Sequence, residues 1–217
     1  KPIWSGVVND GRYSFNIPAN TFAPSQRDEL HRQLGATWKT RHATGWNASA
    51  MFTQYQMLRD ANRQASLPQP QADLGGAGTV TRRDGTGWNT LAAKGTWRPE
   101  GVLGAHIVDF GLQRDSYQLR TVENAATNWI NGAAGARSQA FNGDTQLLGL
   151  WAQDTWKIAP QWKAVLGARA ERWSASNGQT GNATTTVSHP ERNETYVSPK
   201  AAVAYQANDL WVLKAST

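Results

Sequence analysis

The side chains that could carry out chemistry are few and widely spaced along this chain. The sequence has no cysteine, which excludes a disulfide, a thiolate metal ligand and a cysteine nucleophile. Its histidines do not follow the spacing of a metal site; they are His31, His42, His106 and His189. No HExxH, GxSxG or phosphate-loop motif occurs. We therefore expect no enzyme, no resident metal and no cofactor.

Two groups of charged and aromatic residues are better candidates for function. The first lies on the polar side of alternating segments, where opposite charges can pair and support a wall rather than contact a ligand; it comprises Asp109, Asp115, Arg169, Glu171 and Lys200. The second combines arginines with aromatic rings near two polar stretches, and comprises Arg82, Arg83, Trp88, Tyr117, Arg120 and Trp129. Guanidinium charge and aromatic faces suit an anionic, aromatic ligand.

The elements that position these residues are extended strands. Between residues 147 and 173, apolar and polar side chains alternate on both sides of a short turn at 159–161, and period-2 alternation of this length predicts a strand with one apolar face. The same pattern predicts strands at 31–40, 46–59, 87–98, 103–120, 145–158, 162–175 and 195–206, and a last one from Trp211. Pro199 lacks an N–H group, which predicts a bulge or a gap in pairing.

Polar stretches rich in Gly, Pro, Asn and Ser separate the hairpins. Residues 1–27, 60–86, 121–143 and 176–193 are therefore predicted to be loops. The expected fold is all-β, with about eight antiparallel up-and-down strands in four hairpins, each with a short turn at one end. Three long loops between four short turns place both chain ends on the loop side, as expected for an internal segment of a larger barrel.

The apolar face is expected to meet lipid rather than a protein core. It is rich in alanine, which packs a soluble core poorly, and the strands reach the length of about 9–11 residues that a transmembrane strand needs. The chain has 11 tryptophans against five phenylalanines and five tyrosines, and indoles favour a membrane interface. Aromatic residues beside the short turns would form an interfacial ring: Trp38, Trp46, Trp97, Trp156, Trp162, Tyr205 and Trp211.

Composition leaves two other classes open. The hydrophobic share is 39% and the mean hydropathy is −0.59, which also suits a soluble carbohydrate-binding β protein, and the strand pattern alone suits a passive porin or a small autonomous barrel. The formal net charge is +6 and the isoelectric point is about 9.8. Because the basic residues are spread singly, we do not expect a nucleic-acid partner.

Three motifs, in order, resemble TonB-dependent outer-membrane receptors. Residues 151–158 read WAQDTWKI, residues 167–171 read GARAE, and residues 198–205 read SPKAAVAY. The resemblance implies a barrel of about 22 strands closed by a plug, which imports a scarce nutrient, most often a ferric siderophore, with energy from TonB. Residues 1–217 would then be part of a single barrel domain, without the plug or the region that contacts TonB.

The resemblance also implies the surroundings of the chain. The barrel would lie in the bacterial outer membrane, among lipid and lipopolysaccharide. The arginines of the second group could therefore bind either the iron–siderophore complex inside the barrel or lipopolysaccharide phosphates outside it, and the sequence does not separate these two roles.

Overall fold

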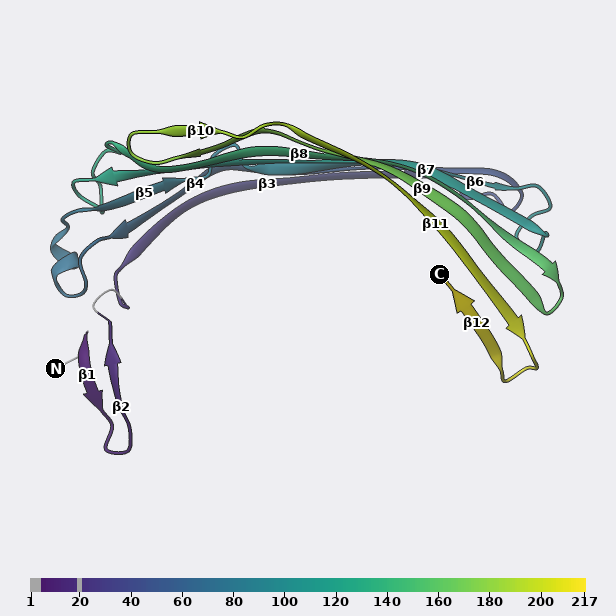
Figure 1. The fold of residues 1–217 in the computed structure, drawn as a ribbon, viewed down its shortest axis with the longest axis horizontal. Helices are drawn as coiled ribbons and strands as arrows, with labels where there is room; N and C mark the ends of the chain where they lie inside the picture. Colours follow the sequence, from purple (N-terminus) through teal and green to yellow (C-terminus); the bar gives the residue numbers. More distant parts are fainter. Residues whose placement is uncertain (1–4, 19–20) are drawn as a thin grey trace.

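The computed structural model describes residues 5–18 and 21–217, and nearly all of this part is antiparallel β structure (Figure 1). Within the described residues the only helical element is a short 3₁₀ helix, η1 (Gln71–Leu74). None of the helices in this part of the chain is long and apolar enough to cross a membrane.

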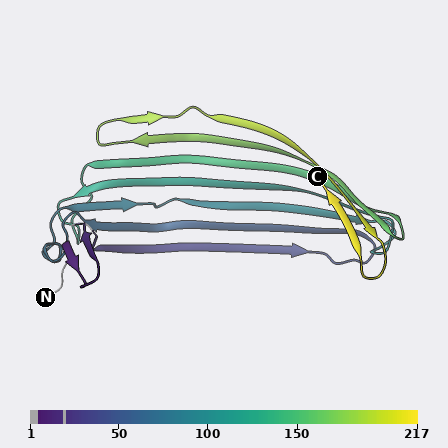
Figure 2. The ribbon, with the colours of Figure 1, turned by 60° about the horizontal axis from the view of Figure 1, so that its bottom comes forward.

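One large sheet contains most of the chain, and Figure 2 shows its strands side by side. The strands are β3 (Ser25–Lys39), β4 (Gly45–Ala65), β5 (Gly78–Arg82), β6 (Gly87–Arg98), β7 (His106–Ala126), β8 (Arg137–Ala159), β9 (Trp162–Gly181), β10 (Thr186–Ser188), β11 (Arg192–Gln206) and β12 (Val212–Ser216). The sheet counts 10 strands. β5 and β6 both lie between β4 and β7, and β10 and β11 both pair with β9. The 10 strands therefore occupy eight positions across the sheet.

The expected up-and-down arrangement in four hairpins is confirmed. Short connections at 40–44, 99–105, 160–161 and 207–211 join the strands at one end of the sheet, which we call the turn end. Connections at 66–77, 127–136 and 182–185 lie at the other end, the loop end. In Figure 1 the loop end is on the left and the turn end is on the right.

The boundaries of the expected loops were wrong, because the strands continue well into them. β4 runs to Ala65, β7 runs to Ala126 and β9 runs to Gly181, so more than half of the stretches 121–143 and 176–193, and a smaller part of 60–86, is paired sheet. These strand ends carry polar side chains on both faces. Period-2 alternation disappears wherever both faces of a sheet meet water, although the backbone pairing goes on.

Two smaller expectations were also wrong. The stretch 1–27 contains a separate hairpin of β1 (Gly6–Asn9) and β2 (Ser14–Ile17), and β3 begins within it. In the turn of that hairpin, the backbone N–H groups of Tyr13 and Arg12 donate to the Asp10 carboxylate and lower its pKa.

The second of these expectations concerns Pro199. At this residue the register of β11 against β9 is continuous, with no bulge.

The large sheet has two distinct faces. We call the face that carries Trp46, Ala93 and Leu150 the outer face and the opposite one, with Lys94 and Asp109, the inner face, as expected for a barrel wall in lipid. Leu150 and Leu166 on the outer face are 56% and 53% exposed. No second protein layer covers these side chains within the described residues.

Candidate functional site

A β-bulge in the hairpin of β3 and β4 creates a heavily connected polar site on the inner face. β3 and β4 pair regularly from the turn end up to His31 opposite Met57, and the register then shifts so that Leu30 lies opposite Arg59. Leu58 is the extra residue of the bulge. Since one added residue reverses the side-chain alternation beyond it, Asp60 points to the same face as Tyr55.

Asp60 is 1% exposed and is surrounded by cationic and polar groups. Its Oδ1 accepts a hydrogen bond from Arg83 Nη1 at 3.2 Å, and its Oδ2 lies 3.2 Å from His31 Nε2 and 3.8 Å from Arg27 Nη2. Glu29 pairs with the same Arg27 at 2.7 Å. We call Arg27, Glu29, His31, Asp60 and Arg83 the Asp60 cluster. Its charges compensate each other, which allows a carboxylate to be buried.

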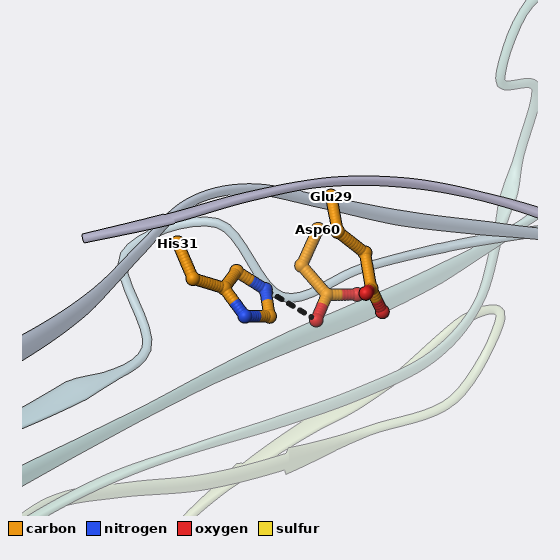
Figure 3. Close-up of side chains that lie close together, drawn as sticks. All are labelled: Glu29, His31 and Asp60. Carbon is orange, nitrogen blue, oxygen red and sulfur yellow. Dashed lines mark hydrogen bonds and ion pairs between the residues drawn. The ribbon is translucent and has the colours of Figure 1, made fainter. Parts of the chain in front are cut away.

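Donor geometry within this cluster also fits a metal ion. One ligand atom from each of Glu29, His31 and Asp60 lies within 4.8 Å of the others, and Figure 3 shows their side chains converging. However, Arg83 and His31 already bind the two oxygens of Asp60. A metal cation would have to displace the Arg83 guanidinium, so the cluster is better suited to hold two strands together than to bind a metal.

An aromatic platform adjoins the Asp60 cluster. The Tyr55 hydroxyl lies 2.6 Å from His31 Nδ1, and in a neutral imidazole whose Nε2–H donates to Asp60, Tyr55 must donate to Nδ1. The Tyr55 and Trp88 rings stack with centroids 4.2 Å apart and an interplanar angle of 18°. Tyr117 lies opposite Trp88 in the β6–β7 register. Trp88 is 45% exposed and Tyr117 38%, so the platform, defined as Tyr55, Trp88 and Tyr117, presents aromatic surface on the inner face.

The strand faces divide the six expected ligand residues. Arg83, Trp88 and Tyr117 lie on the inner face, whereas Arg82 and Arg120 lie on the outer face of β5 and β7. Except for Trp129, these residues lie in strands or in the break between β5 and β6, not in long loops as expected. The arrangement therefore separates two arginine environments that the sequence could not distinguish.

Trp129 is placed differently from the other five. It lies in the 127–136 connection, is 8% exposed, and packs with Ala65 and Ala72. Its indole N–H donates to the Ala72 carbonyl oxygen at 2.9 Å. The indole thus joins two loops to each other, and its face is not available to a ligand.

The expected inner-face network forms as local groups of contacts, and Gln153 links Asp109 with Lys200. Asp109 accepts from Lys94 at 2.9 Å and from Thr96 at 2.6 Å. Asp115 accepts from Thr90 at 2.6 Å. Asp115 also accepts from Gln113 at 2.7 Å, Arg169 pairs with Glu171 at 2.8 Å, and Lys200 donates to Gln153 at 3.1 Å. Their role in supporting a lumen wall stays a prediction.

The expected aromatic ring is arranged as neighbouring stacks on the outer face near the turn end. Trp46 and Trp97 stack with centroids 6.0 Å apart, Trp156 stacks on His106 at 5.6 Å, and Trp162 lies 4.6 Å from Tyr205. Trp38 and Trp211 are 58% and 65% exposed. Contact of this ring with a membrane interface stays a prediction.

Sequence reasoning missed Asp60 and Tyr55. Asp60 fell in a stretch predicted to be a loop, and the bulge at Leu58 interrupts the alternation that would have assigned Asp60 to a face. His31 was noted only as an isolated histidine, because its partners are 24 and 29 positions away in the sequence. No local signal in the sequence identifies this cluster.

Comparisons with known proteins agree with this architecture. The family model described as "TonB dependent receptor-like, beta-barrel" matches residues 2–217. The structure is similar to that of P. aeruginosa FpvA solved with an iron-bound heterologous pyoverdine, with a TM-score of 0.62 and 17% identity. The match covers 98% of this chain and 29% of FpvA. No curated protein matches the sequence.

The family match resolves the classes that composition left open. At 17% identity the likeness to FpvA shows the fold alone, whereas the family model covers nearly the whole chain. The family consists of receptors rather than enzymes, and its β-barrel model confirms the resemblance drawn from the three motifs. The chain therefore belongs to the TonB-dependent receptor β-barrel family.

Proposed function

We propose that this chain forms part of the wall of a Gram-negative outer-membrane receptor that imports a ferric siderophore with energy supplied through TonB. Residues 1–217 would belong to a single barrel domain, with the plug and the TonB-contacting region supplied by other parts of the protein. Membership of the receptor family supports this proposal. The similar FpvA was solved with an iron-bound pyoverdine, which favours an iron chelate as the cargo.

The observation that carries the choice of cargo is the aromatic platform of Tyr55, Trp88 and Tyr117. It lies on the polar inner face, where a barrel would pass its ligand, and its rings are partly exposed. Ferric chelates with aromatic groups can stack on such rings. A wall that only lined a passive channel would not need a tyrosine that is held by a hydrogen bond to His31, itself bound to Asp60, and that stacks on Trp88.

Arg83 has an indirect role in this arrangement. Its guanidinium already binds Asp60, so its charge is largely compensated. Arg83 fixes the position of Asp60, Asp60 contacts His31, and His31 contacts Tyr55, which stacks on Trp88. Recognition of the ligand should therefore depend on the aromatic faces more than on this arginine.

Binding to the intact receptor in detergent micelles tests the proposal. We would titrate a panel of ferric siderophores, haem and cobalamin by calorimetry into the wild type, Trp88→Leu and the control Trp38→Leu, whose side chain is on the outer face and 58% exposed. An aromatic contact contributes about 0.5–1.5 kcal/mol, so Trp88→Leu should weaken ferric siderophore binding by about two- to tenfold, and Trp38→Leu should leave it unchanged.

Uptake of radioactive iron by cells with and without TonB tests the energy source. Loss of uptake without TonB is the expected result. Equal binding by Trp88→Leu and the wild type would refute the platform as the ligand contact. Binding of haem or cobalamin in place of every ferric siderophore would refute the cargo, and uptake that continues without TonB would refute energised transport.

A further inference from the structure

Arginines gather on the outer face of the sheet, from about the middle of the strands to the loop end. Strand alternation places them beyond the apolar part of the same face, on β3, β4, β5, β7, β8 and β9. They are Arg32, Arg59, Arg63, Arg82, Arg114, Arg120, Arg137 and Arg172. We call this set the arginine band.

The lower edge of the band follows directly on the apolar surface. Along the outer face of β7, Leu112 is followed by Arg114 two residues later, and along β9 Ala170 is followed by Arg172. On β3, Leu34 is followed in the same way by Arg32. Two residues of a strand span about 7 Å. A molecule lying against the apolar surface would therefore bring its head group to these arginines.

The arginines of this lower edge have no acidic partner among the described residues. Arg32 donates to Gln56 Oε1 at 2.8 Å and Arg114 donates to Gln146 Oε1 at 2.7 and 3.0 Å. Arg172 lies 3.4 Å from Asn193 Oδ1. Neutral amide oxygens orient the guanidinium groups without compensating their charge. All three arginines are exposed.

Higher in the band, only part of the charge is compensated. Arg59 pairs with Asp28 at 3.0 Å and Arg120 pairs with Asp144 at 2.6 Å. Arg63 and Arg137 donate instead to backbone carbonyl oxygens of the loops. The outer face near the loop end therefore keeps an excess of positive charge.

Lysines are distributed differently, so the band is not a by-product of a basic composition. Lys39, Lys94, Lys163, Lys200 and Lys214 all lie on the inner face. The distinction has a chemical meaning, because the planar guanidinium of arginine can bind two oxygens of one phosphate, whereas lysine acts as a point charge.

We propose that the arginine band binds the phosphate groups of lipopolysaccharide in the outer leaflet. This inference rests on the proposed outer-membrane location but not on the proposed cargo. Lipopolysaccharide joins phosphorylated sugars to acyl chains, which matches a surface whose arginines begin where its apolar side chains end. Free phosphate would gain nothing from the apolar part of the surface, so the lipid is the occupant that both features favour.

The test compares two triple variants of the intact receptor in detergent micelles. Arg32→Gln/Arg114→Gln/Arg172→Gln removes the lower edge of the band. Lys39→Gln/Lys163→Gln/Lys214→Gln makes the same change of charge on the inner face, at side chains that have no ion pair or side-chain hydrogen bond within the described residues. The probes are rough-type lipopolysaccharide, the same lipid after enzymatic dephosphorylation, and inorganic phosphate. Retention of the folded form on unheated gels shows that each variant is folded.

Loss of three exposed charge contacts should weaken binding of lipopolysaccharide by about tenfold in the arginine variant. The lysine variant should bind like the wild type, and dephosphorylation should remove the difference. Equal binding by both variants would overturn the proposal, as would inorganic phosphate competing at concentrations similar to those of the lipid. Affinity for the ferric chelate is measured on the same samples. If the receptor binds lipopolysaccharide as expected but does not bind the chelate, the proposed cargo is refuted and the arginine band is not.

Discussion

Removal of the Asp60 carboxylate should destabilise the receptor far more than removal of a similar carboxylate one strand away. Asp60→Ala removes the acceptor for Arg83 and His31, both at 3.2 Å. A hydrogen bond with a charged partner contributes about 1.5–3 kcal/mol. The side chains of Arg83 and His31 are 34% and 25% exposed, so water can partly replace Asp60 and the low end of that range applies to each.

Arg27 adds little to this sum, because it is 3.8 Å from Asp60 and 55% exposed. We therefore expect Asp60→Ala to lower the free energy of unfolding by about 3 kcal/mol. Asp28→Ala is the matched control. Asp28 also pairs with an arginine across β3 and β4, at 3.0 Å, but both side chains are 56% exposed, and an exposed pair contributes about 0.2–1 kcal/mol.

Denaturant titration of the intact receptor in micelles would measure both values, with tryptophan fluorescence and the gel mobility of the folded barrel as independent readouts. A loss of similar size for Asp28→Ala and Asp60→Ala would refute the reasoning from burial. A loss below about 1 kcal/mol for Asp60→Ala would show that the cluster does not stabilise the hairpin beyond the level of a surface ion pair.

Two further predictions concern packing and loop contacts. Gly111→Ala would place a Cβ atom 2.6 Å from the backbone oxygen of Ala93, so it should lower stability by about 1–3 kcal/mol in the same titration. In Gly35→Ala the new Cβ meets nothing closer than 3.9 Å, so stability should not fall; equal losses in the two variants would contradict this. Trp129→Phe removes the donor to the buried Ala72 carbonyl and should speed proteolytic cleavage within 66–77, and an unchanged cleavage rate would show that this hydrogen bond does not hold the loop.

Much of the wall could be predicted from the sequence. Each of the eight expected strands is present, and each hairpin turn is close to its expected place, because alternation in the apolar part of a strand is a local property. The same locality explains the errors in strand length. Beyond Leu148 on β8, for example, both faces are largely polar up to Arg137, so no pattern remains to show that pairing continues.

The candidate site could be predicted only in fragments. Trp88 and Tyr117 were identified by their type, and the structure places them opposite each other across β6 and β7. Asp60 was not identified, because its importance depends on a bulge at Leu58 and on partners from β3 and from the break after β5. A local pattern contains no information about such partners.

The sequence by itself determined that this chain is a wall of paired strands with one apolar face, since the period of side chains along a strand requires no knowledge of its neighbours. Only the tertiary structure decided which face each arginine occupies. Arg82 and Arg83 are adjacent in the sequence, yet one lies in the outer arginine band and the other binds Asp60 on the inner face. The physical reason is register: a displacement by one residue turns a side chain to the opposite face, and register is fixed by pairing with strands that are distant in the sequence.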